Sequence, residues 1–343
     1  MEKVAFILDG RYIYWRLVII AFAAFAAVLM TMALCLRQKK EITALLAAMP
    51  AAVILSLLFS RMIHWYCRFE GYDSFTAALT RPQGGYTLIG AFLGTFLAFI
   101  LVCVLGLAKN LPALLDCAAP GAALGIALGR LGDLFTAADR GKFLISSEAW
   151  HHLPFASAVT NPTSGITEWR FATFFAQSIW AFVVFVVLMV IVLWPHKGTD
   201  EQSGSVFILF MSLYCLGQVL FDSTRYDALY LRSNGFVSLV QILCTVVLVF
   251  ILVQRSFISI KRTGFRFWHP ILWAVALGSL GGAGYMEYYV QRHGNEAMKA
   301  YFIMALCLAV FFVVSRIVGV APHRPKHLKS SVKSSQTDSK TQV

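Results

Sequence analysis

The sequence predicts an all-α polytopic membrane protein with about nine transmembrane helices and a small outer-face head segment. Of its 343 residues, 59% are hydrophobic and only 13% are charged, a composition too apolar for an ordinary water-soluble domain. The apolar residues also gather in runs of roughly 20, the length that a helix needs to cross a bilayer. The nine expected spans are residues 13–36, 42–63, 85–108, 112–134, 170–194, 205–222, 236–254, 267–290 and 299–320.

Positive charge is concentrated on one side of this predicted topology. The formal net charge is +12, and Lys and Arg cluster in "RQKKE" after the first span, in "QRSFISIKRTGFR" after the seventh, and in the C-terminal tail. Lys109 and Lys197 fall in the other two loops of that side. Because basic loops stay cytoplasmic, we expect the N-terminus outside a bacterial plasma membrane and a disordered basic tail, residues 321–343, inside. This placement argues against a nucleic acid partner.

Neither the cysteines nor the histidines form a metal-binding pattern. The seven cysteines are scattered without a CxxC spacing, so most are expected to be small apolar helix residues. His151 and His152 adjoin no matching cysteines or acids, and we expect no metal site there. The first span is too long for the apolar core of a signal peptide, so we expect it to be retained as a helix.

Two connections on the outer side are long enough to hold structure. Residues 67–83 join the second and third spans, and residues 136–169 join the fourth and fifth. The second connection mixes polar and aromatic residues and contains two prolines, so we expect a small head over the membrane or at its interface. The cytoplasmic loops are short, and we therefore expect the chemistry on the outer face.

Charged residues occur in several expected spans or at their ends, where burial is expensive. A charged side chain at membrane depth costs roughly 2.5–3.5 kcal/mol on insertion scales, so it usually faces a partner or a cavity. The informative residues are Arg61, Asp116, Arg130, Asp222 and Arg225. Arginines near helix ends can also simply extend to the lipid headgroups, and that interpretation stays open for Arg225.

Arg130 lies in a sequence that gives it room. Gly129 and Gly132 flank it and remove bulk, which lets another helix or a ligand approach. A planar guanidinium binds a phosphate through two parallel hydrogen bonds, so arginines at headgroup depth suit a phospholipid substrate. Farther upstream, Gly90 and Gly94 in "PQGGYTLIGAFLG" indicate either close helix packing or a lipid-facing groove.

Six segments between about residues 10 and 255 occur in the order of the motifs of one enzyme family. The most specific is "DCAAPGAALGIALGRLGD", Asp116 to Asp133, which is similar to a D-x-x-A-P helix running into a G-R-x-G-N signature. The others are "YWRL" with Tyr14, "SRMIHWY" with Arg61, "GGYTLIGAFLG", "SLYCLGQVLFDSTRYD" with Arg225, and "SLVQIL" with Gln241. By these segments the chain resembles the bacterial prolipoprotein diacylglyceryl transferases.

The resemblance implies a reaction and a set of residues. A diacylglyceryl group moves from phosphatidylglycerol, a membrane lipid, to the lipobox cysteine thiol of a preprolipoprotein; a thioether forms and glycerol phosphate leaves. Cations must stabilise the departing phosphate, and no metal, nucleotide or other cofactor is implied. The candidate catalytic residues are Arg130, Arg225, Asp133 and Asp139. The candidate substrate-binding residues are Tyr14, Arg61, Gly85, Gly90, Gly129, Gly132, Asp222 and Gln241.

The chain also departs from the family pattern. The family histidine falls on Ile89 and a family glutamate on Ala138, although Asp139 is adjacent. Residues 1–255 are expected to form the transferase-like core, and residues 256–320 two helices beyond the usual seven. Two alternatives stay open: a paralogue that binds phospholipid or lipoprotein without this chemistry, and an anion transporter whose arginines surround an axial path.

Overall fold

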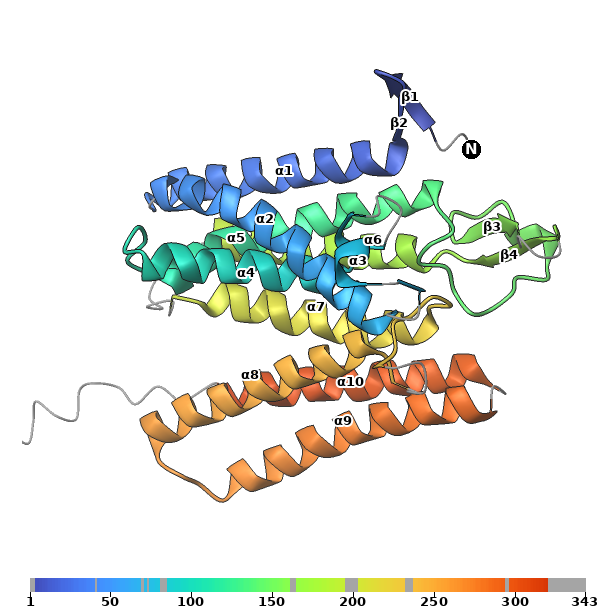
Figure 1. Cartoon of the computed structure of the whole chain (residues 1–343). Coiled ribbons are helices and arrows are strands. Elements are labelled where there is room, and N and C mark those ends of the chain that lie inside the picture. The colour runs from blue at the N-terminus through green and yellow to red at the C-terminus, as the bar shows by residue number, and fades with distance from the viewer. Residues whose placement is uncertain are drawn as a thin grey trace, which may run out of the picture.

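The computed structural model describes residues 4–40, 42–68, 71–72, 74–80, 85–160, 165–194, 203–231, 237–293 and 296–319. Within them, nine long helices run roughly side by side, and two small β-hairpins lie at one end (Figure 1). The long helices are α1 (Trp15–Arg37), α2 (Ile42–Cys67), α4 (Leu88–Val104), α5 (Leu111–Arg130), α6 (Thr173–Leu193), α7 (Ser205–Thr224), α8 (Leu239–Thr263), α9 (Trp268–His293) and α10 (Ala297–Gly319). The expected all-α polytopic fold is confirmed; a six-residue helix, α3 (Phe75–Thr80), follows α2.

Each expected span coincides with one of the nine long helices, but the helices differ in their fitness to cross a bilayer. Among the described residues, seven helices are both long enough and apolar enough to do so. Helix α4 has only 17 residues. Helix α9 has 26 residues but falls outside the set of seven, in keeping with its glycine-rich sequence and Glu287. The chain is a multi-pass membrane protein.

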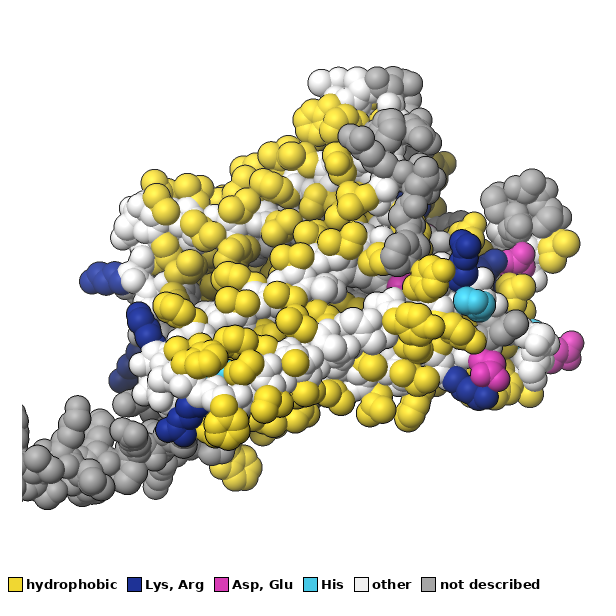
Figure 2. Space-filling view, turned by 90° about the horizontal axis from the view of Figure 1, so that it is seen from below, with side chains coloured by type: hydrophobic (Ala, Val, Ile, Leu, Met, Phe, Trp, Pro, Cys, Tyr) yellow, Lys and Arg dark blue, Asp and Glu magenta, His cyan; other side chains and the backbone are white. Residues whose placement is uncertain are grey.

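The side chains on the surface follow this architecture. Hydrophobic side chains cover the long side of the bundle, and charged side chains gather at its two ends (Figure 2). At the end away from the hairpins the visible charges are Lys and Arg, whereas both signs occur at the hairpin end. Helices α1, α4, α6, α8 and α10 all end away from the hairpins (Figure 1), so the described basic segments after α1 and α8 share one end. Lys197 and the tail, residues 321–343, lie outside the described residues.

Two antiparallel hairpins extend the helices at the other end. Strands β1 (Val4–Leu8) and β2 (Arg11–Tyr14) are joined by Asp9 and Gly10, whose φ angles are +46° and +74°. Left-handed angles at both positions suit a tight two-residue hairpin turn. Strands β3 (Ala156–Thr160) and β4 (Thr167–Phe171) form the second hairpin, which gives the expected head segment a defined structure. Neither hairpin is among the elements expected from the sequence.

Glycines let two helix pairs approach closely. A Cβ on Gly90 of α4 would lie 2.5 Å from the Phe59 backbone oxygen of α2, and one on Gly94 would meet the Leu55 backbone. Both glycines are buried, so the two helices touch backbone to backbone. This contact supports the packing interpretation of Gly90 and Gly94. Helix α1 packs against α5 in a similar way, through Gly121, at which an added Cβ would meet Thr31 and Ala27.

Helix α5 ends four residues before the end of its expected span, 112–134. At Arg130 it passes into a 3-10 turn, Leu131–Phe135. Such tighter turns are common at helix ends. Here the turn places the buried Asp133 beside α1, where its Oδ1 lies 3.0 Å from Arg16 Nη2. The end of α5 is therefore shaped by a charge pair and not by apolar length alone.

Candidate active site

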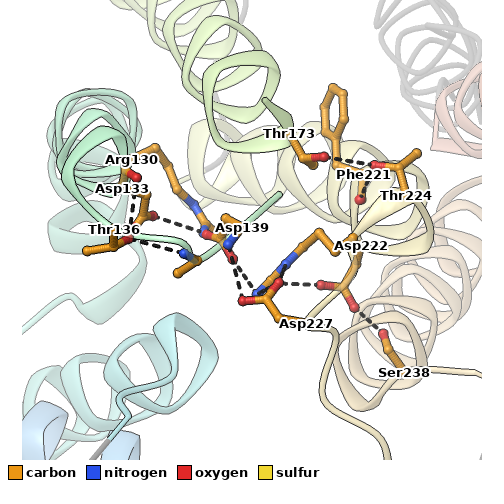
Figure 3. Close-up of polar contacts among 12 residues, drawn as sticks. Arg130, Asp133, Thr136, Asp139, Thr173, Phe221, Asp222, Thr224, Asp227 and Ser238 are labelled. Carbon is orange, nitrogen blue, oxygen red and sulfur yellow. Dashed lines mark hydrogen bonds and ion pairs between the residues drawn. The ribbon is translucent and has the colours of Figure 1, made fainter. Parts of the chain in front are cut away.

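The buried charges gather at the hairpin end of the bundle, where α5 and α7 finish. Arg130 is the last residue of α5, and Arg225 directly follows α7. Between them lies Asp139 of the head segment, which is only 4% exposed. Its Oδ2 pairs with Arg130 Nη1 and its Oδ1 with Arg225 Nη2. One carboxylate thus bridges Arg130 and Arg225, the two arginines that the sequence nominates as catalytic candidates. Figure 3 shows Asp139 between Arg130 on one side and Asp222 and Asp227 on the other.

The backbone around Asp139 holds this carboxylate in place. Its φ of +55° lies in the left-handed region, which aspartate tolerates better than most residues. Its N–H donates to Asp227 Oδ2 at 3.1 Å, and its carbonyl accepts from Phe174 N at 3.1 Å. One residue farther on, the Arg140 carbonyl accepts from Tyr226 N at 2.8 Å. The segment is therefore fixed between the start of α6 and the loop after α7.

Arg225 is surrounded by acids. Its Nη1 lies 3.1 Å from Asp222 Oδ1, and its Nη2 lies 3.1 Å from Asp227 Oδ1. Burial alone would lower the pKa of Arg225, but Asp222 and Asp227 outweigh it, so its pKa lies above the ordinary value. The side chain is consequently held as a guanidinium, able to donate to an anion.

A second layer of hydrogen bonds fixes Asp222. Its Oδ2 accepts from the Ser238 hydroxyl, and Ser238 caps the N-terminus of α8. Gln241 completes a capping box: its N–H donates to Ser238 Oγ at 3.1 Å, and its Oε1 accepts from Ser238 N at 3.0 Å. Such a reciprocal pair satisfies two helix-end donors at once. Asp222 and Gln241, both candidates from the sequence, are thus joined through Ser238.

Asp133 connects the arginines to α1. It binds Arg16 and lies 3.9 Å from Arg130 Nη1. Gly132 makes this approach possible, because a Cβ there would already lie 3.3 Å from the Arg16 backbone oxygen. Gly129 lies in looser contact with α1, since a Cβ there would be 3.7 Å from Ala23 Cβ. The two glycines beside Arg130 therefore serve the α1–α5 interface.

Arg140 is a further buried cation at this end. It is 3% exposed, its Nη2 donates to the Thr136 and Asp133 carbonyls at 2.8 and 3.2 Å, and its guanidinium lies 4.4 Å from the centre of the Phe174 ring. Burial lowers its pKa below the ordinary value.

We call the whole assembly the Asp139 cluster. It comprises four arginines and four aspartates, so the formal charges cancel: Arg16, Arg130, Arg140, Arg225, Asp133, Asp139, Asp222 and Asp227.

The remaining sequence candidates have their described contacts elsewhere. Arg61 of α2 donates from Nη1 to the Gly85 carbonyl at 3.3 Å and lies 4.4 Å from the centre of the Tyr86 ring. Together with Gly90, these contacts belong to the α2–α4 interface. Tyr14 ends β2 and is half exposed. His151 of the head segment bonds to the Ile145 carbonyl at 3.0 Å and stacks on Trp169, so it organises the head.

Sequence reasoning missed three members of the cluster. Asp227 lies only two residues after Arg225, and Arg140 directly follows Asp139, so proximity in sequence was the available signal. Arg16 had a weaker one, its place at the start of a span. Of the two departures from the family pattern, Ala138 immediately precedes Asp139, whose carboxylate occupies the centre of the cluster, whereas Ile89 is distant in sequence and lies in the first turn of α4.

Comparison with known proteins agrees with the motif resemblance. The sequence model of the prolipoprotein diacylglyceryl transferase family matches residues 3–254. A phosphatidylglycerol–prolipoprotein diacylglyceryl transferase 1 of Clostridium perfringens is 27% identical over 267 residues, which cover 77% of this chain and 98% of the relative. Transferases of the same name from Clostridium botulinum strain Loch Maree and Oceanobacillus iheyensis are 28% and 24% identical, over 95% and 90% of their lengths. The family match ends within α8, before α9 and α10.

Proposed function

The chain belongs to the prolipoprotein diacylglyceryl transferase family, and on that premise we propose that it transfers a diacylglyceryl group from phosphatidylglycerol to a prolipoprotein. The proposed acceptor is the thiol of the lipobox cysteine. The observation that carries the proposal beyond the family is the Arg130–Asp139–Arg225 bridge. It places two guanidinium groups and one carboxylate at the end of the bundle where a lipid headgroup would lie.

The proposed chemistry is a displacement at carbon. The acceptor sulfur attacks the diacylglyceryl carbon that carries the phosphate ester, so a sulfur–carbon bond forms and the carbon–oxygen bond breaks. The electron pair leaves on the phosphate oxygen as glycerol phosphate. Arg130 and Arg225 donate hydrogen bonds to that phosphate, and their fork geometry matches two of its oxygens. Charge that develops on the leaving group is thereby stabilised in a site largely shielded from water.

Asp139 takes the second role in this proposal. A bound phosphate competes with its carboxylate for Arg130 and Arg225, which frees at least one carboxylate oxygen beside the reacting groups. That oxygen accepts the thiol proton as sulfur attacks, a general-base role. A cysteine thiol ionises near pH 8.5 in model peptides, so a weak base is sufficient. Asp133 and Asp222 hold the arginines from either side.

The proposed assignments extend to the membrane and the rest of the chain. The hairpin end faces outward and the basic end inward across a bacterial plasma membrane. Residues 1–255 form the transferase core with its head at 136–169, and residues 256–320 add two helices. The basic residues 321–343, which lie outside the described residues, are assigned to the cytoplasmic side. A reporter that is active only in the cytoplasm, fused after Val343, tests this orientation and contradicts it if inactive.

The decisive experiment is direct. Purified protein is incubated with phosphatidylglycerol micelles and a lipobox peptide, and the diacylglyceryl adduct on the cysteine is sought by mass spectrometry. The adduct should form with the wild-type chain and be lost in Arg130→Ala. Arg37→Ala is the matched control, because Arg37 is exposed at the opposite end of α1. Phosphatidylglycerol binding without any adduct would instead identify a lipid-binding paralogue, the outcome that Ile89 favours.

A further inference from the structure

Helices α9 and α10 lie outside the matched residues 3–254, yet they pack along the core of the bundle. Helix α10 packs against α7 and α8, and α9 packs against α10 (Figure 1). The four helices share one apolar core that includes Leu216 of α7, Leu248 of α8, Ala283 of α9 and Met304 of α10. Such continuity indicates that the extra pair is part of the same folded unit.

This apolar interface contains a buried acid. Glu287 of α9 is 3% exposed. Its Oε2 accepts from Gln241 Nε2 at 3.1 Å, and its Oε1 accepts from Gln291 Nε2 at 2.9 Å. A buried acid is costly unless it is well bonded, so its place opposite Gln241 calls for a physical reason.

Glu287 determines which way the Gln241 amide points. The amide nitrogen donates to two acceptors, the Val219 carbonyl at 3.1 Å and Glu287 Oε2. With both donors used on that side, the amide oxygen faces the opposite way and accepts from Ser238 N at 3.0 Å. A reversed amide would set its oxygen against two acceptors and its nitrogen against a donor, which is unfavourable.

The oriented amide leads directly to the Asp139 cluster. Gln241 and Ser238 fix one another in the capping box, and the Ser238 hydroxyl donates to Asp222 Oδ2. The other oxygen of Asp222 lies 3.1 Å from Arg225 Nη1, and Arg225 pairs with Asp139. An unbroken series of hydrogen bonds and ion pairs therefore runs from α9 to the proposed phosphate-binding arginines.

Space beside the amide explains why it needs a fixed partner. A cavity of about 270 Å³ is lined by Gln241 and Glu287 and otherwise mainly by apolar side chains, among them Ile242, Leu280 and Met304. Without Glu287, the Gln241 side chain has room to turn away from Ser238.

We propose that Glu287 is a positioning residue for the transfer reaction, acting through Gln241, Ser238 and Asp222 on Arg225. The inference rests on the proposed function, because Arg225 must serve the reaction for its orientation to affect the rate. Helix α9 thus supplies an element of this site from outside the residues that match the family.

The test compares Glu287→Leu and Glu287→Gln in the peptide assay, with Trp273→Phe as control. Trp273 also joins α9 to α8, because its Nε1 donates to Ser256 Oγ at 2.8 Å. Its replacement therefore removes a hydrogen bond of the same interface that is not part of the series from Glu287 to Arg225. We expect Glu287→Leu to lower kcat about tenfold relative to this control, the effect of one hydrogen bond to a charged group. The KM for phosphatidylglycerol and the thermal midpoint should match those of the control. Glu287→Gln, which keeps an acceptor oxygen at the same reach, should recover most of the rate.

A double-variant cycle separates positioning from general destabilisation. Once Ser238→Ala has broken the series, adding Glu287→Leu should lower kcat less than twofold further, because residues that act in one network are not additive. Full additivity, or a Glu287→Leu rate equal to that of Trp273→Phe, would overturn the inference while the proposed function stands. A wild-type chain that forms no adduct would overturn both.

Discussion

Replacing Arg130 with alanine should stop transfer while leaving the protein folded. In the structure Arg130 pairs with Asp139 and lies 3.9 Å from Asp133. After its removal Asp139 still pairs with Arg225, and Asp133 still pairs with Arg16 at 3.0 Å. Because neither aspartate loses its last cation, the expected cost in unfolding free energy is about 1.5–3 kcal/mol, that of a hydrogen bond to a charged group.

The expected loss of activity is much larger. Arg130 is proposed to bind the phosphate on which charge develops, and removing one such donor typically costs about 100- to 1,000-fold in rate. Arg130→Lys keeps the charge but loses one of two parallel hydrogen bonds, so its rate should fall roughly tenfold. The assay is the initial rate of adduct formation by mass spectrometry, with thermal unfolding in the same micelles.

The controls decide between a chemical and a structural effect. Arg37→Ala, at the opposite end of α1, should match the wild type in both measurements. An Arg130→Ala chain that transfers at the wild-type rate would refute the phosphate-binding role outright. A chain that loses both rate and thermal transition would move the test to Arg130→Lys, where a folded variant with an undiminished rate would refute the role equally.

Three further predictions concern stability. Burial lowers the pKa of Lys142, so the folded state binds that proton less tightly than the unfolded chain does. The stability of the protein therefore rises as the pH approaches the ordinary lysine pKa. Lys142→Met should raise the thermal midpoint at pH 7, and this gain should shrink by pH 10. Gly90→Val should destabilise the protein by about 3 kcal/mol or more, because the valine side chain would meet the α2 backbone in a close-packed interface. Gly278 has open space around it, so the control Gly278→Ala should be neutral or stabilising in the same unfolding assay. Asp116 accepts from Gly204 N and Phe207 N at 2.5 and 2.8 Å at the start of α7; Asp116→Ala should therefore cost about 1–2 kcal/mol, as other lost helix caps do, while adduct formation per folded molecule stays unchanged.

The helices could be predicted because one physical requirement sets them. A bilayer demands apolar runs of nearly fixed length, and that signal needs no knowledge of which helix lies beside which. Where a local polar interaction competes, the prediction loses accuracy. Helix α5 ends at Arg130 because the next turn carries Asp133 to Arg16. Similarly, Asp9 and Gly10 are residues typical of a hairpin turn, but a search for apolar spans alone does not detect such a turn.

The members of the site were harder to predict than the helices. The sequence places three arginines near the hairpin-end termini of their helices: Arg61, Arg130 and Arg225. Their similar depth in the membrane alone would predict that the three side chains form a single cluster. In the structure Asp139 joins Arg130 to Arg225, whereas the described contacts of Arg61 are with Gly85 and Tyr86. Which helix ends meet depends on the packing of α1 on α5 and of α2 on α4, and single-sequence hydropathy contains no such pairing information.

Asp139 also shows why the position of a residue in a sequence motif is less informative than the place of its side chain in the fold. The family acid falls on Ala138, one residue earlier, yet the left-handed backbone at Asp139, with φ of +55°, turns the chain so that this carboxylate meets both arginines.

The cluster is neutral without a substrate, so a lipid phosphate brings one excess negative charge beside Asp139. Negative charge nearby favours the protonated form of a carboxyl group. In the proposed mechanism, phosphate binding therefore favours transfer of the thiol proton to Asp139, because the protonated cluster, at +1, balances the single negative charge of the phosphodiester. Lipid binding and proton acceptance are coupled by charge balance, which predicts that Asp139→Asn binds phosphatidylglycerol at least as tightly as the wild type while forming the adduct more slowly. Weaker lipid binding by Asp139→Asn, measured with the same micelles, would contradict this coupling.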